Sequence, residues 1–227
     1  QVAKYFEKSG VSKGDTVAIV GDNKPEWVIS ELAAQLLGAY PVGIYQDSVV
    51  SEVEYILQKT SAKIVVAEDQ EQTDKILEIA DKVSSISKII YYDKKGMYQY
   101  NDKRLVYYYD IYEDSATDRE LVDYYSSNLD KLSLDNVAVM CTTSGTTGFP
   151  KIAMLTHRNL AFMSHSLAKA DPKFETDEFV SFLPLPWIGE QMMCVAGAII
   201  FGFVVNFPEN HDTVQNDMKE IGPNLIF

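Results

Sequence analysis

Residues Val137 to His157 read VAVMCTTSGTTGFPKIAMLTH, and this stretch sets the fold expected for the centre of the chain. An apolar run comes first, small and hydroxylated residues follow, and a second apolar run begins after Lys151. The pattern predicts a strand, a flexible loop and a second strand. Small residues allow backbone N–H groups to surround an anion, hydroxyl groups add donors, and the lysine adds a positive charge. Such a set of groups suits a polyphosphate.

A solvated turn between two strands is the alternative interpretation, because turns share this Ser/Thr/Gly composition. The pair Pro150-Lys151 at the end of the loop favours phosphate binding over a plain turn. The nucleotide-binding pattern G-x-x-x-x-G-K-[ST] does not fit, because Pro150 occupies the position of its second glycine and Ile152 follows the lysine. The sequence therefore argues against a Walker-type ATPase.

At these residues the chain resembles the adenylate-forming superfamily, which includes acyl-CoA synthetases, firefly luciferase and peptide-synthetase adenylation domains. The signature of that superfamily reads approximately [YF]TSGTTGxPKG, and Thr142 to Lys151 match it almost position for position. The likeness continues through Met154 to Leu160, and the N-terminal stretch GDTVAIVGDNKPEWVISELAAQLLGAYPVGIY is similar to acyl-CoA synthetases. Two positions depart from the signature: Cys141-Thr142 replaces the aromatic lead-in, and Ile152 replaces the final glycine.

The resemblance implies that the loop holds the phosphates of ATP. Hydroxyl groups donate hydrogen bonds, glycines allow a close backbone approach, and Lys151, the implied catalytic residue, neutralises charge or pins the loop. The implied nucleotide-binding residues are Thr143, Ser144, Gly145, Thr146, Thr147, Gly148 and Lys151. ATP, CoA and a carboxylic acid such as a fatty acid are the implied substrates. Mg²⁺ is implied by the polyphosphate, although no cluster of ligands in the sequence supports it.

Short apolar strands alternate with amphipathic helices in residues 1–92, an α/β region. The expected strands are Thr16–Val20, Val42–Tyr45, Lys63–Ala67 and Ser87–Tyr92. The expected helix Glu26–Leu37 carries Trp27, Ile29 and Leu32 at helical spacing. The alternation predicts an α/β fold with mainly parallel sheets flanked by helices. Residues 93–132 form an irregular tyrosine-rich segment and a helix in this prediction, and residues 133–227 form the phosphate-loop region.

A second informative stretch, Leu183 to Gln191, reads LPLPWIGEQ. Two prolines make a stiff turn at the end of an expected strand, and ligands bind outside the carboxyl ends of strands in open parallel sheets. The superfamily has a similar element, LPLxHxxx, beside its carboxylate and acyl sites. Trp187 stands at the histidine position, and Glu190 matches an acidic residue of long-chain synthetases, so the resemblance implies that both bind the acid. A core tryptophan and a charge at a helix N-terminus are the alternative.

Composition narrows the partners of the chain. A formal charge of −13 argues against nucleic acid and against an anionic membrane surface. The apolar stretch Met192 to Val205 has 14 residues, too few to span a bilayer, and predicts a buried core helix. Cys141 and Cys194 are expected to be reduced thiols, which indicates a cytoplasmic protein. A peripheral contact of the complete protein with a membrane is compatible with this prediction. The three histidines show no metal-ligand spacing, so no metal site is predicted.

Elements that follow in the superfamily have no match in these 227 residues. They are the acidic magnesium ligand, the ribose-binding aspartate, the hinge and the C-terminal lid domain. We therefore expect residues 1–227 to be a partial N-terminal AMP-binding domain, inactive alone and prone to self-association through its cut surface. The expected function is that of an acyl-CoA synthetase, an acid–thiol ligase. A peptide-synthetase or luciferase-like adenylation domain and a non-catalytic nucleotide-binding module remain the alternatives.

Overall fold

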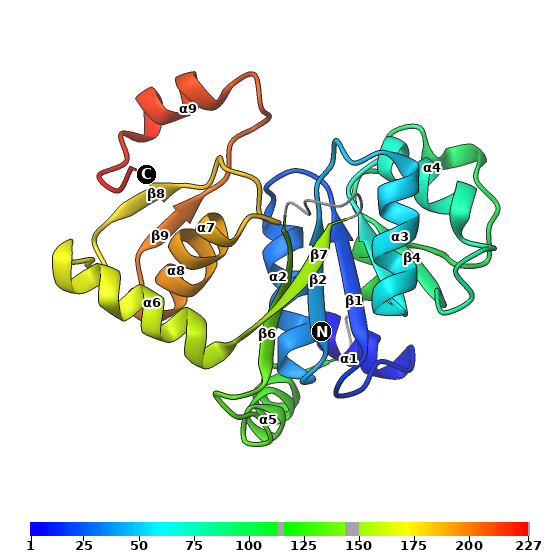
Figure 1. Ribbon diagram of the computed structural model, residues 1–227, viewed down its shortest axis with the longest axis horizontal. Coiled ribbons are helices and arrows are strands. Elements are labelled where there is room, and N and C mark those ends of the chain that lie inside the picture. The colour runs from blue at the N-terminus through cyan, green and yellow to red at the C-terminus, as the bar shows by residue number, and fades with distance from the viewer. Residues whose placement is uncertain (113–115, 144–149, 227) are drawn as a thin grey trace.

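The computed structural model describes residues 1–112, 116–143 and 150–226. Two groups of elements lie side by side in Figure 1, a large sheet with its helices and a smaller group formed by the last part of the chain. In the described residues, the large sheet has seven strands in the order β5-β4-β3-β1-β2-β6-β7, and the smaller group pairs β8 with β9.

The strands of the large sheet are short, and most of their residues are buried. They are β1 (Thr16–Val20), β2 (Tyr40–Ile44), β3 (Ile64–Ala67), β4 (Lys88–Tyr91), β5 (Leu105–Tyr107), β6 (Val137–Thr143) and β7 (Lys151–Thr156). Neighbouring strands run parallel, except that β6 and β7 pair antiparallel. Every residue of β1 is buried, as expected for a central strand covered on both faces. The prediction of a mainly parallel sheet is confirmed.

Helices cover both faces of this sheet (Figure 1). They are α1 (Val2–Lys8) and α2 (Pro25–Leu36) on one face, and α3 (Val50–Thr60) and α4 (Gln70–Ile79) on the other. Alternate residues of β1 serve the two cores: Val17 and Ile19 pack with α1 and α2, whereas Ala18 and Val20 pack with α3 and α4. This alternation is the period-two geometry of a strand.

The tyrosine-rich segment supplies the edge strand β5, although its sequence indicated an irregular excursion. Two 3₁₀ turns, Met97–Gln99 and Tyr108–Ile111, flank this strand. The ring of Tyr108 is fully buried in the core under α2, and this burial anchors the segment. Helix α5 (Asp118–Leu129) then begins at a capping box made by Thr117 and Glu120.

The smaller group carries the second stretch of interest. Its elements are α6 (His157–Ala170), β8 (Glu178–Val180), α7 (Ile188–Glu190), the π-helical segment η3 (Gln191–Ala196), α8 (Gly197–Phe201), β9 (Val204–Asn206) and α9 (Val214–Ile221). The predicted helix at 192–205 is η3 and α8, which end at Gly202 (φ 76°), and the chain then enters β9. Across the described residues, no helix combines the length and apolar character needed to cross a bilayer.

Candidate active site

The two ends of the predicted phosphate loop lie on paired strands. Thr143 is the last residue of β6, and Lys151 is the first residue of β7 directly opposite it. The Thr143 hydroxyl donates to the Lys151 carbonyl oxygen at 3.4 Å, and both residues are exposed. The strand–loop–strand prediction is confirmed for the two strands. The predicted ligands Ser144, Gly145, Thr146, Thr147 and Gly148 lie outside the described residues.

The loop ends belong to one edge of the large sheet. Strands β1, β2 and β6 run parallel, so their carboxyl ends reach the same edge, where α/β proteins bind ligands. Thr143 closes β6 at that edge. The polar residues Asp22 and Asn23 follow β1 there as well.

The turn LPLPWIGEQ packs against this sheet. Gly43 of β2 makes the contact possible, because a β-carbon at this position would lie 2.8 Å from the Cα of Pro186 and 3.1 Å from the ring of Trp27. Strand β2 is also the neighbour of β6, with Val42 paired to Met140. The structure therefore brings the two predicted stretches to adjacent strands, although they are far apart in sequence.

Trp187 lies at the surface of this turn with 37% of its area exposed. Its backbone N–H donates to the Pro184 carbonyl oxygen at 2.9 Å, which tightens the turn. Its ring covers Gly189 so closely that a β-carbon there would lie 2.1 Å from the ring. The indole is thus neither buried core nor freely extended, and its part in binding an acid stays a prediction.

Glu190 is fully buried behind the turn. Its Oε1 accepts a hydrogen bond from the Ser181 hydroxyl at 2.5 Å, and its Oε2 has no hydrogen-bond partner among the described residues. Burial raises the pKa of Glu190 to about 7, and the hydrogen bond from Ser181 only partly offsets this. Burial therefore favours the protonated form of this carboxyl relative to an exposed glutamate. Its predicted contact with the acid remains untested.

Asn23 joins the two groups of elements, and the sequence analysis did not single it out. Its Nδ2 donates to the Ser181 hydroxyl at 2.8 Å and to the Leu183 carbonyl oxygen at 2.7 Å. Its Oδ1 accepts from the Leu185 backbone N–H at 3.2 Å. The available signal was its position, a polar residue just after a central parallel strand.

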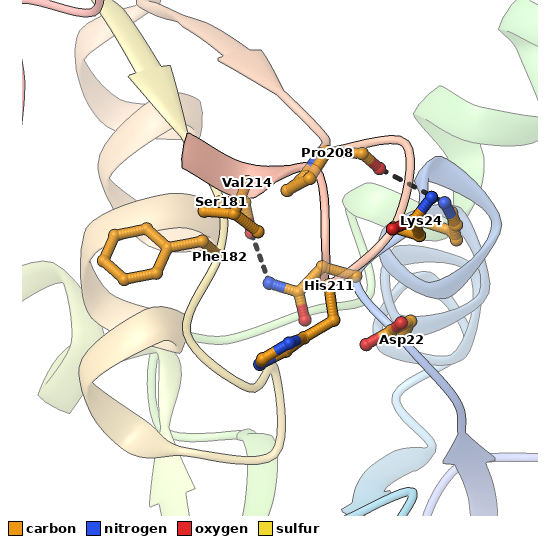
Figure 2. Close-up of a pocket in the computed structure, with 9 residues that line it drawn as sticks. Asp22, Lys24, Ser181, Phe182, Pro208, His211 and Val214 are labelled. Carbon is orange, nitrogen blue, oxygen red and sulfur yellow. Dashed lines mark hydrogen bonds between the residues drawn. The ribbon is translucent and has the colours of Figure 1, made fainter. Parts of the chain in front are cut away.

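A small polar cleft with a free volume of about 20 Å³ lies beside Asn23, between the strand ends of the two sheets (Figure 2). Its walls come from Asp22, Asn23, Lys24, Ser181, Phe182, Pro208, Asn210, His211 and Val214. The Lys24 ammonium group donates to the carbonyl oxygens of Pro208 and Glu209 at 3.2 and 2.6 Å. The cation of this cleft thus already serves to hold the loop after β9.

A larger apolar groove with a free volume of about 370 Å³ runs between α2, η3, α8 and β9. Its lining is Pro25, Val28, Ile29, Leu32, Cys194, Val195, Ala198, Ile199, Phe203, Val205 and Phe207. Trp187 does not contribute to this lining. The tryptophan that the resemblance assigns to acid binding therefore does not border this groove in the described part of the chain.

The described residues do not form a magnesium site. No group of three or more His, Cys, Asp or Glu side chains within residues 1–112, 116–143 and 150–226 could hold a metal ion. The implied Mg²⁺ therefore has no support from these side chains, and no chemical step is assigned to it.

Comparison with known proteins identifies the family. The model of the AMP-binding enzyme family matches residues 1–227, so the chain belongs to that family. A long-chain-fatty-acid–CoA ligase, ACSBG2 of Homo sapiens, is 30% identical over 100% of this chain and 34% of its own length. ACSBG2 of Xenopus laevis is 31% identical over 91% of this chain and 28% of its own length. The chain thus spans about a third of these curated relatives.

Solved structures agree on the fold. A luciferase-like enzyme of the Zophobas morio mealworm superposes with a TM-score of 0.77 at 18% identity, over 98% of this chain and 49% of its own. A putative long-chain-fatty-acid CoA ligase of Rhodopseudomonas palustris has a TM-score of 0.76 at 20% identity, over 96% and 51% of the two chains. At these identities the likeness shows the fold alone.

Proposed function

We propose that residues 1–227 are the N-terminal part of an ATP-dependent acyl-CoA synthetase, called here the parent enzyme. The observation that carries the proposal is the placement of two stretches at one sheet edge. The β6–β7 pair presents the two ends of TSGTTGFPK, and the LPLPWIGEQ turn rests on the adjacent strand β2. The family match and the long-chain ligases among the relatives support the assignment of substrate class.

The proposed reaction has two steps. In the first, a carboxylate oxygen of the acid bonds to the α-phosphorus of ATP while the bond from that phosphorus to pyrophosphate breaks. In the second, the CoA thiolate attacks the acyl carbon, and AMP leaves with the electron pair of the broken carbon–oxygen bond. The first step needs a held triphosphate and an acid aligned with it, and the second needs the acyl adenylate held for attack by the thiolate. Positioning and charge stabilisation are therefore the main work of the protein.

Residues of the loop hold the leaving group in this proposal. Thr143 and Lys151 are exposed and lie opposite each other at the two ends of the loop, so a hydroxyl group and a positive charge are available there. Ser144, Thr146 and Thr147 add donors, and Gly145 and Gly148 give the phosphates access to the backbone. Losing one preorganised donor at a site of developing charge costs about 10²–10³ in rate.

The turn supplies the acid side of the proposed site. Trp187, part exposed beside the sheet edge, borders the acid. Within the described part of the chain, Glu190 Oε2 is an unpartnered polar atom behind the turn, as is Gln191 Oε1. A protonated Glu190 could donate through Oε2 to an acid carboxylate, and its raised pKa keeps a protonated fraction at pH 7. Both cysteines are free and buried, which supports a reducing compartment such as the cytoplasm.

ATP–pyrophosphate exchange in the parent enzyme tests this proposal. Fatty acids, amino acids and luciferin-type aromatic acids serve as the panel. Exchange that depends on a fatty acid, with later CoA-dependent acyl thioester formation, is the expected result. Exchange with amino acids only, or ATP binding without exchange, would instead favour one of the two alternatives.

Two variants link that exchange to the loop. Thr146→Ala and Lys151→Ala should each slow exchange about 10²–10³-fold while the protein remains folded. Thr117→Ala is the matched control, because it removes a hydroxyl of the same kind from the N-cap of α5. If the Thr146 and Lys151 variants exchange as fast as this control, the loop does not bind phosphate and is an ordinary turn.

A further inference from the structure

Helix α2 buries a carboxyl group that the proposed reaction does not use. Glu31 is 1% exposed, and both its oxygens accept hydrogen bonds from amide side chains. Gln35 Nε2 donates to Oε1 at 3.1 Å, and Gln191 Nε2 donates to Oε2 at 2.9 Å. The structure gives Glu31 no ion-pair partner among the described residues. The carboxyl is thus held by neutral donors alone.

Each of these amides has a second acceptor on the main chain. Gln35 Nε2 also donates to the Ala138 carbonyl oxygen of β6 at 3.0 Å. Gln191 Nε2 also donates to the Leu185 carbonyl oxygen, inside the LPLPWIGEQ turn, at 2.9 Å. Both N–H groups of each amide are therefore used, which fixes the orientation of the two side chains.

These contacts form one buried link from β6 to the turn, and Glu31 is its centre. Strand β6 leads directly to the phosphate loop, and the turn carries Trp187. The link combines a contact between near neighbours in the sequence, Glu31 and Gln35, with a contact between Glu31 and Gln191, which are 160 positions apart. A displacement of either stretch relative to the other must break one of its hydrogen bonds.

Retaining this carboxyl is costly, which argues for a specific task. Burial raises the pKa of Glu31 to about 7, opposed in part by hydrogen bonds from Gln191 and Trp27. The Glu31 carboxyl contributes to the raised pKa of two buried thiols, Cys141 on β6 and Cys194 on η3. An apolar side chain would fill the site without this cost.

The backbone around Gln191 is also unusual. Gln191 begins the π-helical segment η3, and it is 1% exposed with its Oε1 unpartnered. Single π-helical turns inside helices occur often at functional sites. Here the π-helical start coincides with an amide that joins the turn to α2.

We propose that Glu31 is a positioning residue, which holds the phosphate-loop strand and the acid-binding turn in one fixed relation through Gln35 and Gln191. The inference rests on the proposed function for the tasks of the two stretches. Its mechanical part, the coupling of the turn to α2, stands on the hydrogen bonds alone.

Fluorine NMR of the parent enzyme tests the mechanical part without any activity. Tryptophan is replaced by 5-fluorotryptophan, and Trp187→Phe identifies the Trp187 signal. Glu31→Ala should shift or broaden that signal, whereas Glu31→Gln, which keeps an amide oxygen for Gln191, should stay closer to wild type. Leu37→Ala is the control, since it removes core volume at the end of the same helix outside the link. An unchanged Trp187 signal in Glu31→Ala would overturn the proposal.

Pyrophosphate exchange tests the catalytic part. Misplacing a reacting group by about 1 Å can cost about 10²-fold. We expect Glu31→Ala to lose 10- to 100-fold in kcat/KM for the acid, with KM for ATP within about twofold and most of the loss rescued by Glu31→Gln. Loss no larger than that of Leu37→Ala would refute positioning. A wild-type parent without exchange for any acid would defeat the proposed function instead, and the NMR result would still decide the coupling.

Discussion

Stability of this chain should fall as the pH rises through neutrality, and Glu31 should be a principal cause. The folded protein binds the Glu31 proton more tightly than the unfolded chain, because burial raises the pKa from 4.5 to about 7. Between these two values the folded form keeps a proton that the unfolded form has released. The free energy of unfolding therefore decreases with pH across this window, and the contribution is fully lost above pH 7.

The size of the effect follows from the shift. One pKa unit corresponds to about 1.4 kcal/mol, so the shift of Glu31 is equivalent to roughly 3 kcal/mol of unfolding free energy between pH 5 and pH 8. Glu31→Gln removes this ionisation and leaves a constant offset, because its amide nitrogen then faces the Gln35 donor while its amide oxygen still accepts from Gln191. Glu190, whose pKa is also raised, is present in both proteins, so its effect cancels in the difference.

Urea unfolding of the dilute 227-residue chain at pH 5, 6, 7 and 8 measures this difference by tryptophan fluorescence. Wild type should lose roughly 3 kcal/mol relative to Glu31→Gln between the two ends of the series. A difference between the proteins that does not change with pH would refute the reasoning. It would mean that the Glu31 carboxyl has an ordinary pKa in the fold.

Two further variants address the turn. Gly189→Ala places a methyl group where the Trp187 ring now lies, so it should displace the ring. Both this variant and Trp187→Ala should alter the preference between medium-chain and long-chain acids in pyrophosphate exchange, and unchanged preferences in both would exclude the indole from the acid site. Asn23→Ala removes three hydrogen bonds at about 1 kcal/mol each, so it should lower the free energy of unfolding by about 3 kcal/mol. Asn101 is exposed, and Asn101→Ala is the control that should leave the free energy of unfolding unchanged. Equal stability of these two asparagine variants would show that Asn23 does not join the sheets.

The parallel sheet could be predicted from the sequence because its signals are local. Apolar runs such as Thr16–Val20 and Ile64–Ala67 are fully buried strands, and helices separate them. At the start of α6, Thr156 and Asn159 form a capping box, which is also a local signal. Patterns of this kind depend on neighbours along the chain, and a single sequence displays them directly.

The buried face of α2 shows where local pattern fails. The periodic apolar residues Trp27, Ile29 and Leu32 indicated the inward face, yet Ile29 is 43% exposed. Ser30, Glu31 and Gln35 are buried instead. Gln35 and Glu31 can occupy this face because they have partners on β6 and after the turn, respectively. Such partners are distant in sequence, so helical periodicity alone could not reveal them.

The candidate site was predictable to a similar extent. The resemblance located its two stretches, and their approach at one sheet edge follows from the rule for parallel sheets. The contact of Pro186 with Gly43 and the three hydrogen bonds of Asn23 depend on how the smaller group of elements packs against the large sheet. A sequence carries no direct signal for such contacts without information on covariation.

Transfer of an oxygen isotope gives the most direct test of adenylate formation. The parent enzyme is incubated with ATP, CoA and a fatty acid whose two carboxylate oxygens are both ¹⁸O, and the AMP produced is analysed by mass spectrometry. Attack of the carboxylate on the α-phosphorus predicts one ¹⁸O atom in each AMP molecule, because the bridging oxygen leaves with AMP when CoA takes the acyl group. AMP without the label, or ADP as the product, would contradict the proposed chemistry.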